Sequence, residues 1–124
     1  MNKYLLLACG SLAGGFARYF MAGAVYRVAG AGFPHGTLAV NLLGCFLIGF
    51  FDALAEDKLF LGPEGRMLMM IGFCGAFTTF STLILETAGL TRTGQYWTAL
   101  ANIGASVLFG LLVFRLGLIL GRAI

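Results

Sequence analysis

Near the middle of a long apolar run the chain carries the stretch Gly72-Phe73-Cys74-Gly75-Ala76-Phe77-Thr78-Thr79-Phe80-Ser81-Thr82. It combines two glycines with four Ser and Thr hydroxyl side chains. Glycine and β-branched residues are poor helix formers, so this stretch predicts a helix that breaks there. Inside a bilayer, freed backbone groups are tolerated only where protein buries them or an ion contacts them, and broken membrane helices build ion sites in this way.

The same run is one of four apolar segments that can each cross a membrane. They cover about residues 4–28, 36–54, 64–90 and 96–120. A transmembrane helix needs about 20 apolar residues, and the 124-residue chain is 60% hydrophobic and 10% charged, with a mean hydropathy of +0.94. We therefore predict an all-α integral membrane protein, with residues 1–124 forming a single four-helix membrane domain whose third helix is broken.

Basic residues divide unevenly between the two ends of such a bundle. With four spans both termini lie on the same side of the membrane, together with Lys3, Lys58, Arg66, Arg115 and Arg122. The opposite side carries Arg27 and Arg92. Because basic residues favour the cytoplasmic side, the division favours cytoplasmic termini.

Composition argues against catalysis and nucleic-acid binding. The chain has one histidine, His35, and its three cysteines, Cys9, Cys45 and Cys74, show neither metal-ligand nor redox spacing. No nucleophile and base, and no pair of acids, come together in the sequence. The eight Lys and Arg residues are dispersed, so the net charge of +3 forms no basic patch. We predict a protein that is not an enzyme and has no nucleic-acid partner.

Polar side chains within the spans are the main candidates for function, because they are costly in hydrocarbon. Residues four apart share a helix face, which predicts three polar rows: Thr37-Asn41-Cys45, Thr78-Thr82-Glu86 and Asn102-Ser106-Gly110. Interhelical hydrogen bonding would explain any single row. Three rows together favour a bundle around a narrow path. The position of Glu86, about one turn from the end of its span, predicts that it reaches toward the interface.

Arg18 lies inside the first span at the end of a row of small residues. Gly10, Gly14 and Arg18 are spaced four apart, a pattern that lets a neighbouring helix approach closely. Two interpretations stay open. The arginine forms an anion-attracting vestibule, or it donates to backbone carbonyls as a structural clamp.

Three motifs resemble the Fluc/CrcB family of fluoride channels, and together they cover the chain. They are Gly14-Gly15-Phe16-Ala17-Arg18-Tyr19, Gly36-Thr37-Leu38-Ala39-Val40-Asn41-Leu42-Leu43-Gly44, and the stretch from Gly72 to Thr82. The resemblance implies passive export of fluoride across the plasma (inner) membrane by a multi-pass protein. It also implies a dual-topology dimer, in which two four-helix subunits insert antiparallel in the lipid bilayer.

The resemblance also assigns roles to individual residues. It places Asn41, Phe80 and Ser106 in the pore, with the ring edge of Phe80 and nearby hydroxyls facing fluoride. The hydroxyl residues Ser81 and Thr82 and the guanidinium of Arg18 complete this predicted path. A structural sodium ion on the two-fold axis is expected to bind the backbone carbonyls of Gly75 and Thr78. Carbonyl oxygens suit a hard cation, which fits a broken helix.

Four positions depart from the family pattern. Leu83 stands where a second pore phenylalanine is expected, and Ile84 follows it in place of a hydroxyl residue. On the fourth span, Gly110 and Phe114 occupy positions where the family tends to carry hydroxyls. Because these changes remove part of the polar path, a homodimer and one subunit of a heterodimer with fixed orientation both remain open.

Two other classes of membrane protein are alternatives. A small multidrug-type exporter has a similar length, but it needs a carboxylate in the first span, where this chain has only Arg18. In a membrane anchor subunit the polar rows would only join helices. Haem anchors usually carry buried histidines, whereas His35 is expected in a loop.

Overall fold

The chain forms four long helices joined by short loops. The structure, a computed structural model, describes residues 2–124. Its helices are α1 (Lys3–Ala29), α2 (His35–Asp52), η1 (Ala53–Asp57), α3 (Pro63–Gly65), η2 (Arg66–Cys74), α4 (Gly75–Phe77), α5 (Phe80–Arg92) and α6 (Tyr96–Ala123). Four helical segments, Lys3–Ala29, His35–Asp57, Pro63–Arg92 and Tyr96–Ala123, are long and apolar enough to cross a membrane. The prediction of an all-helical protein with four such helices is confirmed.

Local sequence explains where several helices begin and end. The side chain of Asn2 accepts a hydrogen bond from the Tyr4 N–H at 2.9 Å and so caps α1. Gly30 ends the same helix with a φ of 81°, which glycine adopts without strain. Pro63 occupies the first turn of α3, where its missing N–H costs no helical hydrogen bond.

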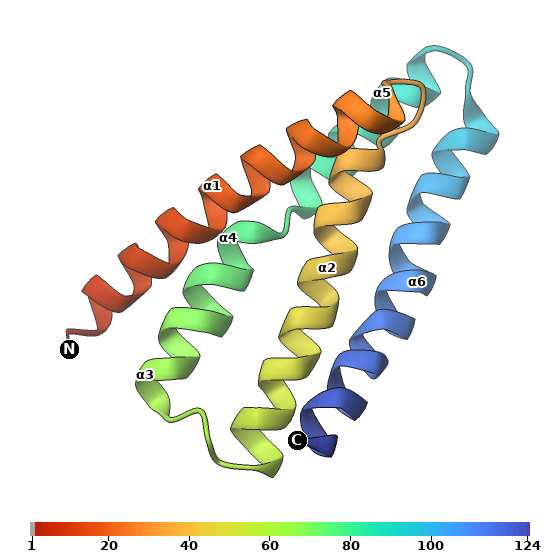
Figure 1. Cartoon of the computed structure of the whole chain (residues 1–124). Coiled ribbons are helices and arrows are strands. Elements are labelled where there is room, and N and C mark those ends of the chain that lie inside the picture. The colour runs from red at the N-terminus through yellow and green to blue at the C-terminus, as the bar shows by residue number, and fades with distance from the viewer. Residues whose placement is uncertain (1) are drawn as a thin grey trace.

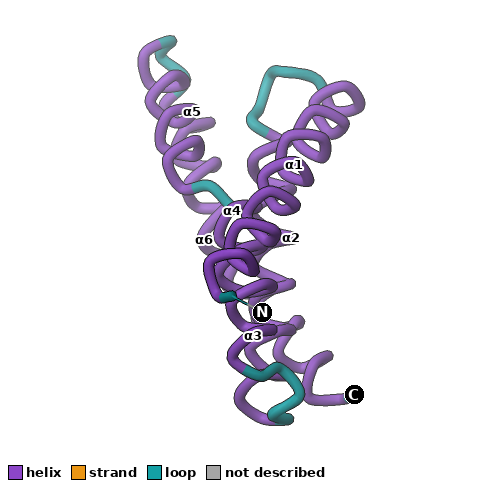
Figure 2. Tube along the Cα trace, turned by 90° about the vertical axis from the view of Figure 1, so that its left-hand side faces the viewer, coloured by secondary structure: helices purple, strands orange, loops and turns teal. Residues whose placement is uncertain are grey.

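The four segments run alternately up and down, and the two ends of the chain lie toward the same end of the bundle (Figure 1). Helix α2 packs along α6, while α1 packs against η2 and α4. Toward the opposite end, α5 and α1 diverge from each other, as Figure 2 shows. The bundle is therefore closely packed at one end and splayed at the other.

Two ion pairs join helices at the closely packed end. Arg122 near the end of α6 pairs with Asp57 of η1 at 2.6 Å. Arg66 pairs with Glu56, and its Nη2 donates to the carbonyl of Ala55 at 2.8 Å. Both η1 and η2 are wide helices with i→i+5 hydrogen bonds, and Arg66 connects the end of the first to the start of the second.

Gly10 and Gly14 let α1 approach the third segment closely. A Cβ atom at Gly10 would meet the carbonyl oxygen of Leu68, and one at Gly14 would meet that of Phe73. Both contacts are with backbone, which cannot move aside as a side chain can. The predicted row of small residues on α1 is therefore a packing surface against η2.

We expect Gly14→Ala to lower the free energy of unfolding by about 1–3 kcal/mol, because the added methyl group forces α1 away from η2. The matched control is Gly15→Ala, because a Cβ at Gly15 would point into open space, with no atom of another helix within 4 Å. Unfolding of both variants in detergent micelles measures the difference. Equal stabilities would show that α1 does not pack on η2 in this way.

Candidate functional site

Two extended residues, Thr78 and Thr79, separate α4 from α5. Thr78 has φ and ψ of -86° and 156°, and Thr79 has -149° and 112°. The Thr79 side chain caps α5 by accepting from the N–H of Thr82 at 3.3 Å. The Thr78 hydroxyl donates to the carbonyl of Cys74 at 2.9 Å. Threonine hydroxyls that bond to nearby backbone thus stabilise this extended pair locally.

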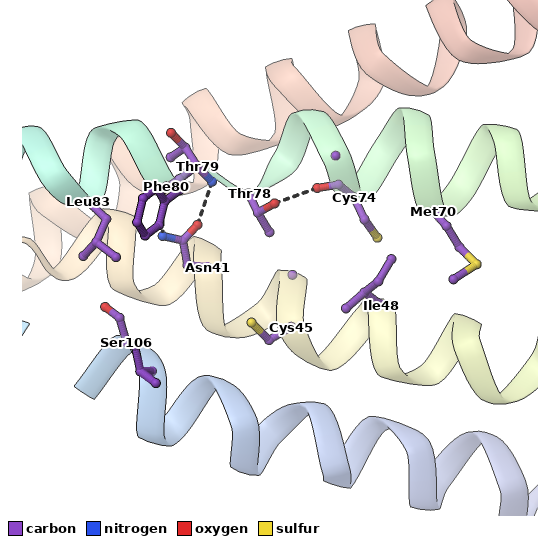
Figure 3. Close-up of a pocket in the computed structure, with 13 residues that line it drawn as sticks. Asn41, Cys45, Ile48, Met70, Cys74, Thr78, Thr79, Phe80, Leu83 and Ser106 are labelled. Carbon is purple, nitrogen blue, oxygen red and sulfur yellow. Dashed lines mark hydrogen bonds between the residues drawn. The ribbon is translucent and has the colours of Figure 1, made fainter. Parts of the chain in front are cut away.

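Asn41 of α2 holds the extended pair from the neighbouring helix. Its Oδ1 accepts from the N–H of Thr79 at 2.8 Å, and its Nδ2 donates to the Thr79 carbonyl at 3.0 Å. One side-chain amide therefore satisfies both backbone groups of one residue. Figure 3 shows the bond from the Thr79 nitrogen to the Asn41 amide oxygen.

The extended pair changes the hydrogen bonding of two carbonyl groups. In a continuous α-helix the N–H of Thr79 would donate to Gly75, and that of Thr82 would donate to Thr78. Here these N–H groups donate to the side chains of Asn41 and Thr79. The carbonyls of Gly75 and Thr78 thereby lose their usual helical donors. Such freed carbonyls suit a monovalent hard cation, and they belong to the two residues for which a sodium ion was expected.

A cavity of about 400 Å³ lies between the third segment, α2 and α6. Five of the predicted site residues line it: Asn41, Gly75, Thr78, Phe80 and Ser106. Figure 3 shows Asn41, Phe80 and Ser106 around this cavity, on α2, α5 and α6 respectively. The Ser106 hydroxyl oxygen is buried and has no hydrogen-bond partner within residues 2–124. It is therefore free to bond to an occupant of the cavity.

A second cavity, of about 630 Å³, is more polar and lies between α1, α2 and α5. Its polar lining includes Arg18, Tyr26, Thr37, Thr82 and Glu86. The two predicted site residues Arg18 and Thr82 are thus separated from the five in the first cavity. Thr79 lines both cavities, so the extended pair lies between them.

Glu86 lies at the centre of a hydrogen-bonded group in the second cavity. Its Oε1 accepts from the hydroxyls of Tyr26 at 2.9 Å and Thr37 at 2.7 Å. Tyr26 lies near the end of α1 and Thr37 near the start of α2, so Glu86 bonds to both neighbouring helices close to this end of the bundle. The expected row Thr78-Thr82-Glu86 is wrong for Thr78, whose extended backbone puts it out of helical register with Thr82. Thr82 and Glu86 do share α5 and line the second cavity.

Arg18 has a buried Nε atom with no hydrogen-bond partner in the described part of the chain. Arg18 also lines the second cavity, which is where the vestibule interpretation requires the charge to lie.

Of the remaining predicted positions, Ser81, Ile84, Gly110 and Phe114 line neither cavity. Ser81 is exposed, with its hydroxyl 3.4 Å from that of Thr79. Of the four departures from the family pattern, Leu83 is buried and lines the first cavity, whereas Ile84 is exposed. Gly110 faces the Cys45 thiol, and the backbone of Phe114 lies against Gly49.

Sequence reasoning missed Thr79 and Tyr26 as members of the site. Thr79 is one of the polar residues within its span, but the sequence does not show that Asn41 binds it. The available signal is a threonine directly before a helical segment, because threonine is a favoured N-cap residue. Here Thr79 is the N-cap of α5. Tyr26 carries no such signal because its partner, Glu86, is 60 residues away.

The family model described as "CrcB-like protein, Camphor Resistance (CrcB)" matches residues 5–118. The chain is 43% identical to a "Fluoride-specific ion channel FluC" of Maridesulfovibrio salexigens, over 100% of this chain and 98% of that protein. It is 47% identical to a protein of the same name from Chlorobaculum tepidum, over 98% of this chain and 96% of the relative. These relatives are named as ion channels, in agreement with the prediction that the chain is not an enzyme.

Proposed function

The chain belongs to the CrcB family, and from this premise we propose that it forms a fluoride-selective passive channel through which fluoride leaves the cytoplasm. Its four apolar helices and its family make it a multi-pass protein of the plasma (inner) membrane. The names of the relatives support a fluoride channel over an exporter or an anchor subunit.

The observation that carries the proposal is the cavity shared by Asn41, Phe80 and Ser106. Fluoride is small and strongly hydrated, so it enters a narrow path only where several groups replace its water at once. Ser106 offers an unpartnered hydroxyl, and the positive ring edge of Phe80 can face an anion. Such a path would reject chloride, because chloride is larger and the same groups would replace its hydration water less well.

Arg18 and the second cavity serve as the entrance in this proposal. A guanidinium in the wall of a cavity raises the local concentration of anions. Hydroxyls of Thr82 and Ser81 then lie near Thr79, which is common to both cavities. Fluoride would pass from the second cavity to the first along the hydroxyls of Thr82, Ser81 and Thr79.

We further propose that two copies insert antiparallel as a dual-topology homodimer in the lipid bilayer, each with a broken third helix. Phe80 supports this, because a pore residue that is 73% exposed in the single chain needs a covering partner. The Gly75 and Thr78 carbonyls of both copies would hold a structural sodium ion. Bound sodium would compensate the carbonyl dipoles that the extended pair leaves without helical donors.

A heterodimer is the second candidate assembly, favoured by Leu83. This side chain puts an apolar group in the cavity that Asn41, Phe80 and Ser106 line, where the family pattern has a second phenylalanine. A related partner subunit of opposite orientation would then supply the complete pore.

Fluoride efflux from liposomes that contain only this polypeptide tests the proposal. We expect rapid efflux at a fluoride electrode, with no efflux of chloride in the same vesicles. Protein-free liposomes give the background. Efflux would establish a homo-oligomeric channel that tolerates Leu83, Ile84, Gly110 and Phe114. If the folded protein alone gives only background efflux and a related second subunit restores rapid efflux, the heterodimer is established. If efflux stays at background both without and with the second subunit, the proposed function is overturned.

A further inference from the structure

We infer that Asn41 is a positioning residue: its amide oxygen draws the Thr79 N–H out of the helix and so keeps the Gly75 carbonyl free for a cation. This inference rests on the proposed function, because it concerns the same site. It differs from a direct role in binding fluoride, in which Asn41 would act as a donor to the ion.

The geometry of the amide supports a positioning role. A side-chain amide has one acceptor oxygen and two N–H donors. The oxygen and one donor of Asn41 are both bonded to the backbone of Thr79, at 2.8 and 3.0 Å. Within a low-dielectric bundle these bonds are stronger than in water. One N–H at most remains for an ion, so the main partner of Asn41 is the extended backbone.

Removing the amide leaves the Thr79 N–H without the acceptor that it has in the wild type. A buried N–H without a partner is costly, so it pairs with whatever acceptor its backbone can reach. For Thr79 that acceptor is the Gly75 carbonyl, through an ordinary i→i−4 bond. Without Asn41 the segment is thus expected to become helical through Thr78 and Thr79, and the Gly75 carbonyl is no longer available to a cation.

Backbone carbon chemical shifts of Thr78 and Thr79 in detergent micelles test this step. We expect extended values in the wild type and helical values in Asn41→Ala. The matched control is Asn102→Ala, since Asn102 is also a buried amide within the bundle but donates to the Thr87 hydroxyl. This control should lose stability while Thr78 and Thr79 keep extended values. Asn41→Leu repeats the test with more side-chain volume if Asn41→Ala does not fold.

Sodium dependence and flux provide the second readout. The Tm of the wild type should rise when N-methylglucamine is replaced by sodium, because a ligand that binds only the native state stabilises it. We expect Asn41→Ala to lose this rise, and its fluoride efflux to fall at least about tenfold, the effect of about 1.4 kcal/mol. Asn41→Asp keeps an acceptor for the Thr79 N–H, so it should retain extended shifts and the sodium-dependent rise.

The outcomes separate this inference from the proposed function. Extended shifts in Asn41→Ala or Asn41→Leu, or equal loss of the sodium effect in Asn41→Ala and Asn41→Asp, would overturn the positioning role even if the wild type conducts fluoride. If the wild type conducts no fluoride, the proposed function fails, but the shifts of Thr78 and Thr79 still decide the role of Asn41.

Discussion

Phe80→Ile is expected to reduce fluoride efflux to the level of protein-free liposomes. The substitution removes the aromatic ring, whose positive edge can face an anion, and replaces it with an aliphatic side chain that offers no such edge. Phe80 lines the first cavity together with Asn41 and Ser106. A dehydrated fluoride ion in this cavity would then lose one of the groups that replace its water. The measurement is electrode-monitored efflux at equal protein density.

The control for this variant is Phe109→Ile on α6. Phe109 is exposed on the bundle surface and borders neither the first nor the second cavity. The same chemical change there should leave efflux at the wild-type rate. Size-exclusion chromatography must show that both variants retain the wild-type assembly. Wild-type efflux from correctly assembled Phe80→Ile would remove Phe80 from the pore.

Arg18→Gln is expected to lower the fluoride efflux rate by at least about tenfold at low salt. The second cavity has two arginines, Arg18 and Arg27, against one acid, Glu86, and an excess of one sign of charge raises local anion concentration and entry rates by about 10- to 1,000-fold. Glutamine removes the charge but leaves a polar side chain in the second cavity. Arg18→Lys keeps the charge and should retain most of the efflux. The dependence of efflux on ionic strength should weaken in Arg18→Gln.

Arg92→Gln is the charge-matched control, because Arg92 is exposed in the last turn of α5. It makes the same change in net charge without altering the second cavity and should conduct as the wild type does. If both variants lose efflux to the same degree, the effect belongs to the overall charge. If neither does, Arg18 has no part in attracting the anion.

The sequence predicted which residues are polar inside the membrane but only part of their arrangement. Spacing of four correctly placed Gly10 and Gly14 on one face of α1, because that face belongs to one uninterrupted helix. The same rule was wrong for Thr78 with Thr82 and Glu86, since an extended backbone has no helical periodicity. The spacing rule also could not identify the hydrogen-bond donors of Glu86. These donors, Tyr26 and Thr37, come from other helices.

Sequence alone determined the class of this protein, because crossing a membrane depends on the length and hydropathy of each segment by itself. It also determined that the stretch from Gly72 to Thr82 is a poor helix, since propensity is a local property. Tertiary structure decided that Asn41 binds Thr79, and that Arg18 and Ser106 lie in different cavities. These outcomes depend on the rotation and register of whole helices, which packing between distant segments sets.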